Sequence, residues 1–211
     1  MYKNVSLADQ VYEVIEQKIL NGDYPVGEVL SESRLTEELS VSRTPIREAL
    51  ARLQNERLVE TTAMGTVVLG ITYQDVMDMY EIKMRLEPGV CVMAVEKMDA
   101  ESLQKLEEIV EQQEFFEMKH NLDRLRNLDT DFHDMIYICC KSPIYQSVLS
   151  PIHHKLLKYR KASLENTDRS LHSVEEHRAI FEAIKERDKD KAEKLMLEHI
   201  RHAYESIRKG A

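Results

Sequence analysis

Residues that turn or break the chain are concentrated near its beginning, and this distribution limits the fold more than any other feature. Four of the six glycines, Gly22, Gly27, Gly65 and Gly70, lie in the first 70 residues. The strand-like segments lie there too, whereas the rest of the chain shows only helical periodicity. All eight histidines lie in that helical remainder. We therefore predict a mostly α-helical protein of two domains, residues 1–72 and 73–211.

The first part alternates helices with short strands. Ser6 and Asp9 form a capping box that begins a helix, and residues 21–25 end it. A second helix is expected over residues 31–39, a tight turn at 40–42, and a third helix through residue 53. Strands at 58–61 and 66–69 then flank Gly65 as a β-hairpin. This order is typical of a winged helix-turn-helix, a DNA-binding unit.

The third helix would enter the major groove with its N-terminal turn, where Arg43, Thr44 and Arg47 lie. The planar guanidinium of arginine can hold both acceptors of a guanine edge or grip a phosphate. A formal net charge of -9 argues against a nucleic-acid binder coated in basic residues, but it does not exclude a local basic face. On helix pattern alone, a solvated face with scattered arginines remains the alternative.

The second part is predicted to be an all-α six-helix bundle over residues 73–97, 99–118, 121–140, 143–165, 169–186 and 188–208. No apolar run approaches the length of a membrane span, and no signal peptide precedes the first helix. Three cysteines do not form a disulfide framework. These features favour a cytoplasmic protein with no membrane partner.

Histidines and one carboxylate suggest a metal site in the helical part. Asp129 and His133 are four residues apart and share one face of a predicted helix, while His177 and His199 lie on two later helices. Three imidazoles and a carboxylate suit a divalent transition metal. Spacing alone does not single them out, because other histidines are equally available: His120, His153, His154, His172 and His202.

The first part resembles the GntR family of bacterial transcription regulators in three strings: GDYPVGEVL at 22–30, LTEELSVSRTPIREALARL at 35–53 and GTVV at 65–68. The resemblance implies a winged helix-turn-helix that binds double-stranded operator DNA. The positions it implies as DNA contacts are Arg34, Arg43, Thr44, Arg47 and Gly65. One departure is Arg57, which stands where the family usually has glycine, and this puts the end of the third helix in question.

The second part is similar to the FCD effector domain of the FadR subfamily, through RLEP at 85–88, DTDFH at 129–133 and the Glu-His pairs ending at 177 and 199. Six helices rather than seven resemble its VanR-like, metal-binding branch. The resemblance implies a zinc, nickel or manganese ion on Asp129, His133, His177 and His199. It also implies that Arg85 points into the cavity and binds the carboxylate of an effector. The alternative is that Arg85 forms an ion pair with Glu81 or Glu87 on its own helix, as helical arginines commonly do. Arg160 and Tyr137 are candidates for further effector contacts.

We therefore expect a ligand-responsive, DNA-binding transcription regulator, a repressor that acts as a homodimer and is not an enzyme. Its effector would be a small organic or sugar acid that binds beside the metal. One alternative is a metal-free acyl-CoA-sensing regulator of the same family. The other is a helical metalloenzyme, which the missing His-Glu-x-x-His motif and the helix-turn-helix disfavour.

Overall fold

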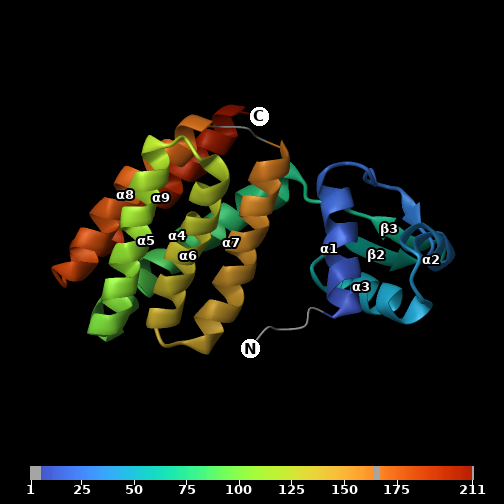
Figure 1. Cartoon of the computed structure of the whole chain (residues 1–211), viewed down its shortest axis with the longest axis horizontal. Coiled ribbons are helices and arrows are strands. Elements are labelled where there is room, and N and C mark those ends of the chain that lie inside the picture. The colour runs from blue at the N-terminus through green and yellow to red at the C-terminus, as the bar shows by residue number, and fades with distance from the viewer. Residues whose placement is uncertain (1–5, 164–166, 211) are drawn as a thin grey trace. The chain divides into compact units, whose positions relative to one another are not determined.

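The computed structural model describes residues 6–163 and 167–210, except for the side chains of residues 160–171 and 210. The chain divides into two units, the first ending at Tyr73 and the second beginning at Gln74. Figure 1 shows a small unit of helices and strands and a larger unit of helices alone. The predicted fold class, a winged helix-turn-helix followed by an all-α bundle, is confirmed.

The first unit contains three helices, which pack around one apolar core. They are α1 (Leu7–Leu20), α2 (Glu32–Leu39) and α3 (Arg43–Asn55). Ser6 and Asp9 form the expected capping box at the start of α1, and α1 packs on α3. Ser40 ends α2 in the left-handed conformation, with φ at 54°, and this sharp turn redirects the chain into α3. The fully buried side chains Ile15, Leu35, Ile46 and Leu53 lie in this core.

A three-stranded antiparallel sheet forms the wing. β2 (Val59–Thr62) and β3 (Gly65–Val68) make the predicted hairpin, and β1 (Val29–Leu30) pairs with β3 on its other side. Gly65 has φ at 126°, and a Cβ added there would lie 2.9 Å from Cγ1 of Val29. The glycine is therefore required by the packing of the wing itself, because any side chain would be both strained and crowded.

Arg57 adopts the backbone conformation of the glycine that the resemblance leads one to expect. Its φ is 58°, in the left-handed region. The N–H groups of Arg57 and Leu58 donate to the carbonyls of Gln54 and Leu53, as at an ordinary glycine-capped helix end. The end of α3 therefore has the same backbone geometry as a helix that ends at glycine. Arg57 adopts this geometry at the energetic cost of placing a side chain in the left-handed conformation.

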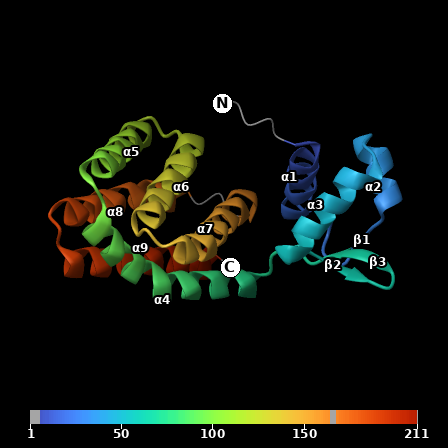
Figure 2. The same cartoon turned by 90° about the horizontal axis from the view of Figure 1, so that it is seen from below.

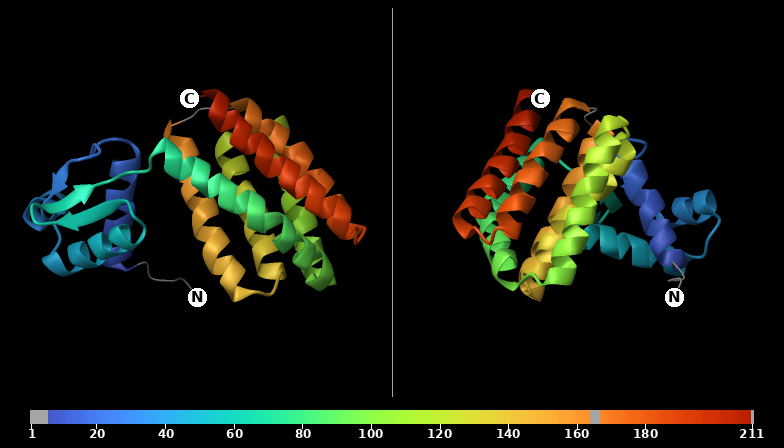
Figure 3. Two further views of the ribbon diagram at one scale, coloured as in Figure 1. Left: turned by 180° about the vertical axis from the view of Figure 1, so that it is seen from behind. Right: turned by 60° about the vertical axis from the view of Figure 1, so that its left-hand side comes forward.

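The described part of the second unit has six helices: α4 (Tyr73–Lys97), α5 (Ala100–Met118), α6 (Leu122–Cys139), α7 (Pro143–Ser163), α8 (Thr167–Lys185) and α9 (Lys189–Gly210). Consecutive helices α5 and α6, α6 and α7, and α8 and α9 pack against each other, and α8 also contacts α5 and α6. Figures 2 and 3 show α4 lying beside α9 along one side of this bundle. No helix of the described chain is both long and apolar enough to cross a membrane.

Candidate metal centre and nucleic-acid interface

Three buried histidines meet inside the bundle, each carried by a different helix. His133 comes from α6, His177 from α8 and His199 from α9. The Nε2 atoms of His133 and His199 are 3.2 Å apart, and the rings of His177 and His199 have centroids 4.7 Å apart. Each of the three offers a ring nitrogen within 4.8 Å of the other two, so one ion could contact all of them.

The outer ring nitrogens of two of these histidines are held by carboxylates. His133 Nδ1 lies 2.5 Å from Oε1 of Glu87, and His199 Nδ1 lies 2.7 Å from Oε2 of Glu176. A carboxylate can only accept, so the proton of each neutral ring is on Nδ1 and the lone pair is on Nε2. Both lone pairs therefore face the centre of the group.

The tautomer of His177 follows from a longer chain of hydrogen bonds. Gln113 of α5 donates its amide N–H to the carbonyl of Leu128, 3.0 Å away. Because a carbonyl only accepts, the amide oxygen of Gln113 must face the other way, toward His177 Nδ1 at 3.1 Å. His177 thus carries its proton on Nδ1 as well. All three rings have the arrangement found in metal-binding histidines, whose second nitrogen donates to a fixed acceptor.

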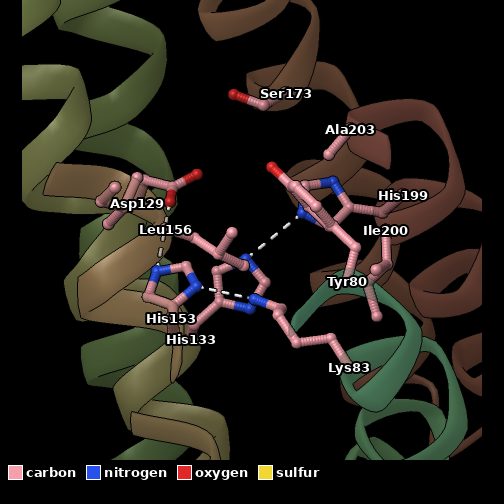
Figure 4. Close-up of a pocket in the computed structure, with 11 residues that line it drawn as sticks. Tyr80, Lys83, Asp129, His133, His153, Leu156, Ser173, His199, Ile200 and Ala203 are labelled. Carbon is pink, nitrogen blue, oxygen red and sulfur yellow. Dashed lines mark hydrogen bonds and ion pairs between the residues drawn. The ribbon is translucent and has the colours of Figure 1, made fainter. Parts of the chain in front are cut away.

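Asp129 adds a carboxylate to the same place. Its Oδ1 lies 3.8 Å from His177 Nε2, and it shares a second possible metal-binding group with His133 and His153. The four residues expected to bind a metal, Asp129, His133, His177 and His199, are thus brought together. Asp129, His133 and His199 border a cavity of about 20 Å³, shown in Figure 4. This volume accepts one water-sized particle and not an organic acid.

Three polar residues of this centre were not distinguished by the sequence analysis. Lys83 and Glu87 are buried on α4, and His153 is buried on α7. The Lys83 ammonium lies 2.7 Å from His153 Nδ1 and 3.1 Å from Oε2 of Glu87. The signal available in the sequence was the four-residue spacing of Lys83 and Glu87, which puts both on one face of a helix.

The structure corrects the expected place of Arg85, which does not point into this cavity. Its side chain is 76% exposed and forms an ion pair with Glu81, 3.3 Å away. It borders a separate open cleft together with Arg201 and Tyr204 of α9. Two residues along a helix turn the side chain by about 200°, so Lys83 and Arg85 cannot share a face. The cation that lines the cavity is Lys83.

Two further effector contacts were expected. Tyr137 is fully buried, and its hydroxyl donates to Oε1 of Glu87, 2.8 Å away, so it supports the centre through that carboxylate. The side chain of Arg160 lies outside the described residues.

Opposite charges, packed closely together, control the ionisation of the centre. Burial opposes the charged form of Glu87, but Lys83 and His133 outweigh it and hold its pKa below the ordinary value. Asp129 behaves in the same way, because His153 and His133 lower its pKa despite burial. Burial and the Lys83 charge lower the pKa of His153 to about 3. At neutral pH the centre thus holds two carboxylates and a neutral His153.

The expected DNA-contacting residues lie on exposed parts of the first unit, except for half-buried Gly65. Arg43 and Thr44 begin α3 and are exposed, and Arg47 is 64% exposed while pairing with Glu32 at 2.9 Å. Arg34 pairs with Glu28. These ion pairs are exposed and therefore weak, so phosphates or bases can replace their carboxylates.

The hydroxyl at the start of α3 also differs from those at the other two helices. Ser6 and Ser31 cap α1 and α2 by accepting backbone N–H groups, whereas Ser42 makes no such hydrogen bond at α3. The N-terminal N–H groups of α3 are therefore not capped by this side chain, and the helix end favours an anion.

Comparison with known proteins gives the same division of the chain. Residues 7–68 match the gntR family of bacterial regulatory proteins, and residues 78–202 match the FCD domain. The gluconate operon transcriptional repressor of Bacillus subtilis is 28% identical over 92% of this chain and 80% of its own length. The uncharacterized HTH-type transcriptional regulator YdhC of that species is 27% identical over 94% and 90%. The structure of Escherichia coli McbR/YncC covers 98% of this chain and 99% of its own, at 23% identity and a TM-score of 0.75.

A winged helix-turn-helix joined to an all-helical FCD domain is the architecture of a DNA-binding transcription regulator. The chain belongs to the GntR family, in the group that carries an FCD domain.

Proposed function

We propose that this regulator is a repressor that senses a small carboxylic acid through a divalent metal ion in its FCD domain. The observation that carries the proposal is the convergence of three Nε2 lone pairs, from His133, His177 and His199, beside the Asp129 carboxylate. Three imidazoles and a carboxylate that converge in this way form a donor set that one divalent cation can engage together.

The residues present fit a transition metal. Imidazole and carboxylate donors suit zinc, nickel or manganese, and Glu87, Gln113 and Glu176 fix the ligating rings from behind. When bound, the ion would supply a positive charge and open coordination positions to an anionic ligand. Asp129, His133, His177 and His199 are the residues that would hold it.

The charge of the cavity supports a carboxylate effector. Lys83 contributes one positive charge, and Glu87 and Asp129 contribute two negative charges, so a divalent ion would leave the group with one net positive charge. One carboxylate neutralises that excess, and Lys83 is the cation that can contact it. The gluconate operon repressor, which this chain resembles over most of its length, makes a sugar acid a suitable first test ligand.

The cavity size supports a coupled rearrangement. An organic acid is too large for about 20 Å³, so its binding requires the walls of the cavity to move. Lys83 belongs to α4, the helix that follows the DNA-binding unit in the chain. A ligand that binds Lys83 therefore contacts the first helix after the DNA-binding unit. If the ligand binds one arrangement of α4 more tightly than another, it shifts the protein toward that arrangement and so changes its affinity for the operator.

A homodimer on a palindromic operator completes the proposal, because two-fold symmetry places two recognition helices on matching half-sites. The test is a gel-shift titration of the protein's own promoter DNA with metal-loaded protein and with protein stripped by a chelator. Gluconate, citrate and an acyl-CoA are then added in turn. We expect retarded DNA and release by an acid only when metal is present. Release by the acyl-CoA from stripped protein would instead favour the metal-free alternative.

A further inference from the structure

His153 lies against the candidate metal centre but comes from a helix that supplies none of the other ligands. It belongs to α7, is 4% exposed, and its ring centroid lies 4.3 Å from that of His133. Asp129, His133 and His153 offer ligand atoms that all lie within 4.8 Å of one another. Figure 4 shows the three side chains grouped at the same side of the cavity.

We propose that His153 is a fourth imidazole ligand of the ion, which makes the centre a site of four histidines and Asp129. This inference rests on the metal centre of the proposed function and extends it by one residue. His133 belongs to both possible metal-binding groups, which are separate in this structure, so an ion that takes ligands from both would draw their side chains together around His133. The Nε2 atom of His153 is buried and makes no hydrogen bond within the described chain, although it lies 3.3 Å from Oδ2 of Asp129.

The hydrogen bond behind His153 differs from those behind the other three rings. His133, His177 and His199 each donate Nδ1–H to an acceptor, whereas His153 Nδ1 accepts from the Lys83 ammonium at 2.7 Å. In this state the proton of the neutral His153 ring is on Nε2. An ion at Nε2 requires the lone pair there, so the ring must lose that proton and carry one on Nδ1 instead.

Metal binding at His153 would then release Lys83. An Nδ1–H group cannot accept from an ammonium, so Lys83 must turn away from the ring. Lys83 then keeps its ion pair with Glu87, 3.1 Å away, and can form a second ion pair with the carboxylate of an incoming acid. Loading the ion thereby frees the cation that the acid needs. Five protein donors would also leave the ion fewer open positions for the acid, and Lys83 would contact the carboxylate of the acid.

Nuclear magnetic resonance can count the ligating rings directly. Full-length protein with ¹⁵N-labelled histidine is loaded with ¹¹³Cd²⁺, because a nitrogen bound to this nucleus is split by scalar coupling. We expect four split imidazole nitrogens in the wild type and three in His153→Gln. The matched control is His154→Gln, the adjacent residue, whose ring is 45% exposed and pairs with Asp134. It should keep four.

The same spectra report the proton of His153. We expect it on Nε2 without metal and on Nδ1 after loading. Three split nitrogens in the wild type, or four remaining in His153→Gln, would overturn the assignment of His153 while leaving the metal centre intact. Protein that shows no split nitrogen and retains no cadmium would overturn the metal centre itself, and the inference with it.

Discussion

Replacing Gln113 by leucine tests the hydrogen bonds that orient the candidate metal centre. Gln113 is 1% exposed, accepts from His177 Nδ1 and donates to the carbonyl of Leu128. In Gln113→Leu nothing holds the proton of His177 on Nδ1, so its lone pair no longer has to face the ion. Loss of such a supporting residue lowers metal affinity by about 10- to 100-fold, which corresponds to about 1.4–2.7 kcal/mol.

The expected stabilisation by metal follows from this range. At a free zinc concentration about 100 times the wild-type dissociation constant, binding stabilises the wild type by about 2.7 kcal/mol. At the same zinc concentration, a tenfold weaker site gives about 1.4 kcal/mol and a hundredfold weaker site about 0.4 kcal/mol. Without metal, the Gln113→Leu variant also loses the hydrogen bond from Gln113 to the carbonyl of Leu128. Because that carbonyl still accepts its hydrogen bond within α6, the loss in the free energy of unfolding should lie at the lower end of about 1–3 kcal/mol.

The assay is a competition titration with a chromophoric zinc chelator, paired with urea unfolding with and without zinc. Gln112→Leu is the matched control, because Gln112 is the adjacent residue of α5 and is exposed. Gln113→Glu separates the two roles, since it keeps an acceptor for His177 and loses the donor to Leu128. If Gln113→Leu binds zinc as tightly as Gln112→Leu, the hydrogen-bond chain has no effect on the centre and our reasoning is refuted.

Three other predictions concern the remaining parts of the molecule. Arg43→Ala or Arg47→Ala should each weaken operator binding by about 1–3 kcal/mol in gel shifts at fixed salt, and unchanged affinity in the double variant would exclude α3 as the reading helix. Lys83→Gln should abolish the response of DNA binding to the effector acid whereas Arg85→Gln should not, and the opposite pattern would restore Arg85 as the effector contact. Arg57→Gly should raise the free energy of unfolding of the first unit by about 0.5–1 kcal/mol, because relief of the left-handed conformation exceeds the entropy that glycine adds to the unfolded chain. Urea unfolding that shows a loss of stability would contradict this.

Local sequence signals were sufficient for most of the fold. The capping box at Ser6, the hairpin around Gly65 and the helical periodicity beyond Thr72 predicted elements that the structure contains. β1 was missed because Val29–Leu30 is too short to alternate. Its strand conformation depends on pairing with β3, a contact between residues far apart in the sequence.

The site was less predictable, because it depends on which face of α4 the bundle buries. The motif around Arg85 drew attention to that arginine, yet it is exposed. The buried stripe of α4 recurs every three or four residues and includes Val76, Tyr80, Lys83, Glu87, Val90 and Ala94. A prediction from hydrophobic periodicity places only apolar residues in the core, so it leaves out Lys83 and Glu87. Charged residues are seldom buried unless they have partners. Their partners His133 and His153 come from other helices, and sequence spacing does not reveal them.

The distribution of the three converging histidines over α6, α8 and α9 has a kinetic consequence. If an ion is held as proposed, by ligands on three separate helices, it can leave only when those helices move apart. Its exchange is then limited by opening of the bundle, a process of microseconds to seconds or slower, and not by the lability of a single metal–ligand bond. Such a protein would ignore brief changes in metal supply and respond to an acid that arrives at an ion already in place.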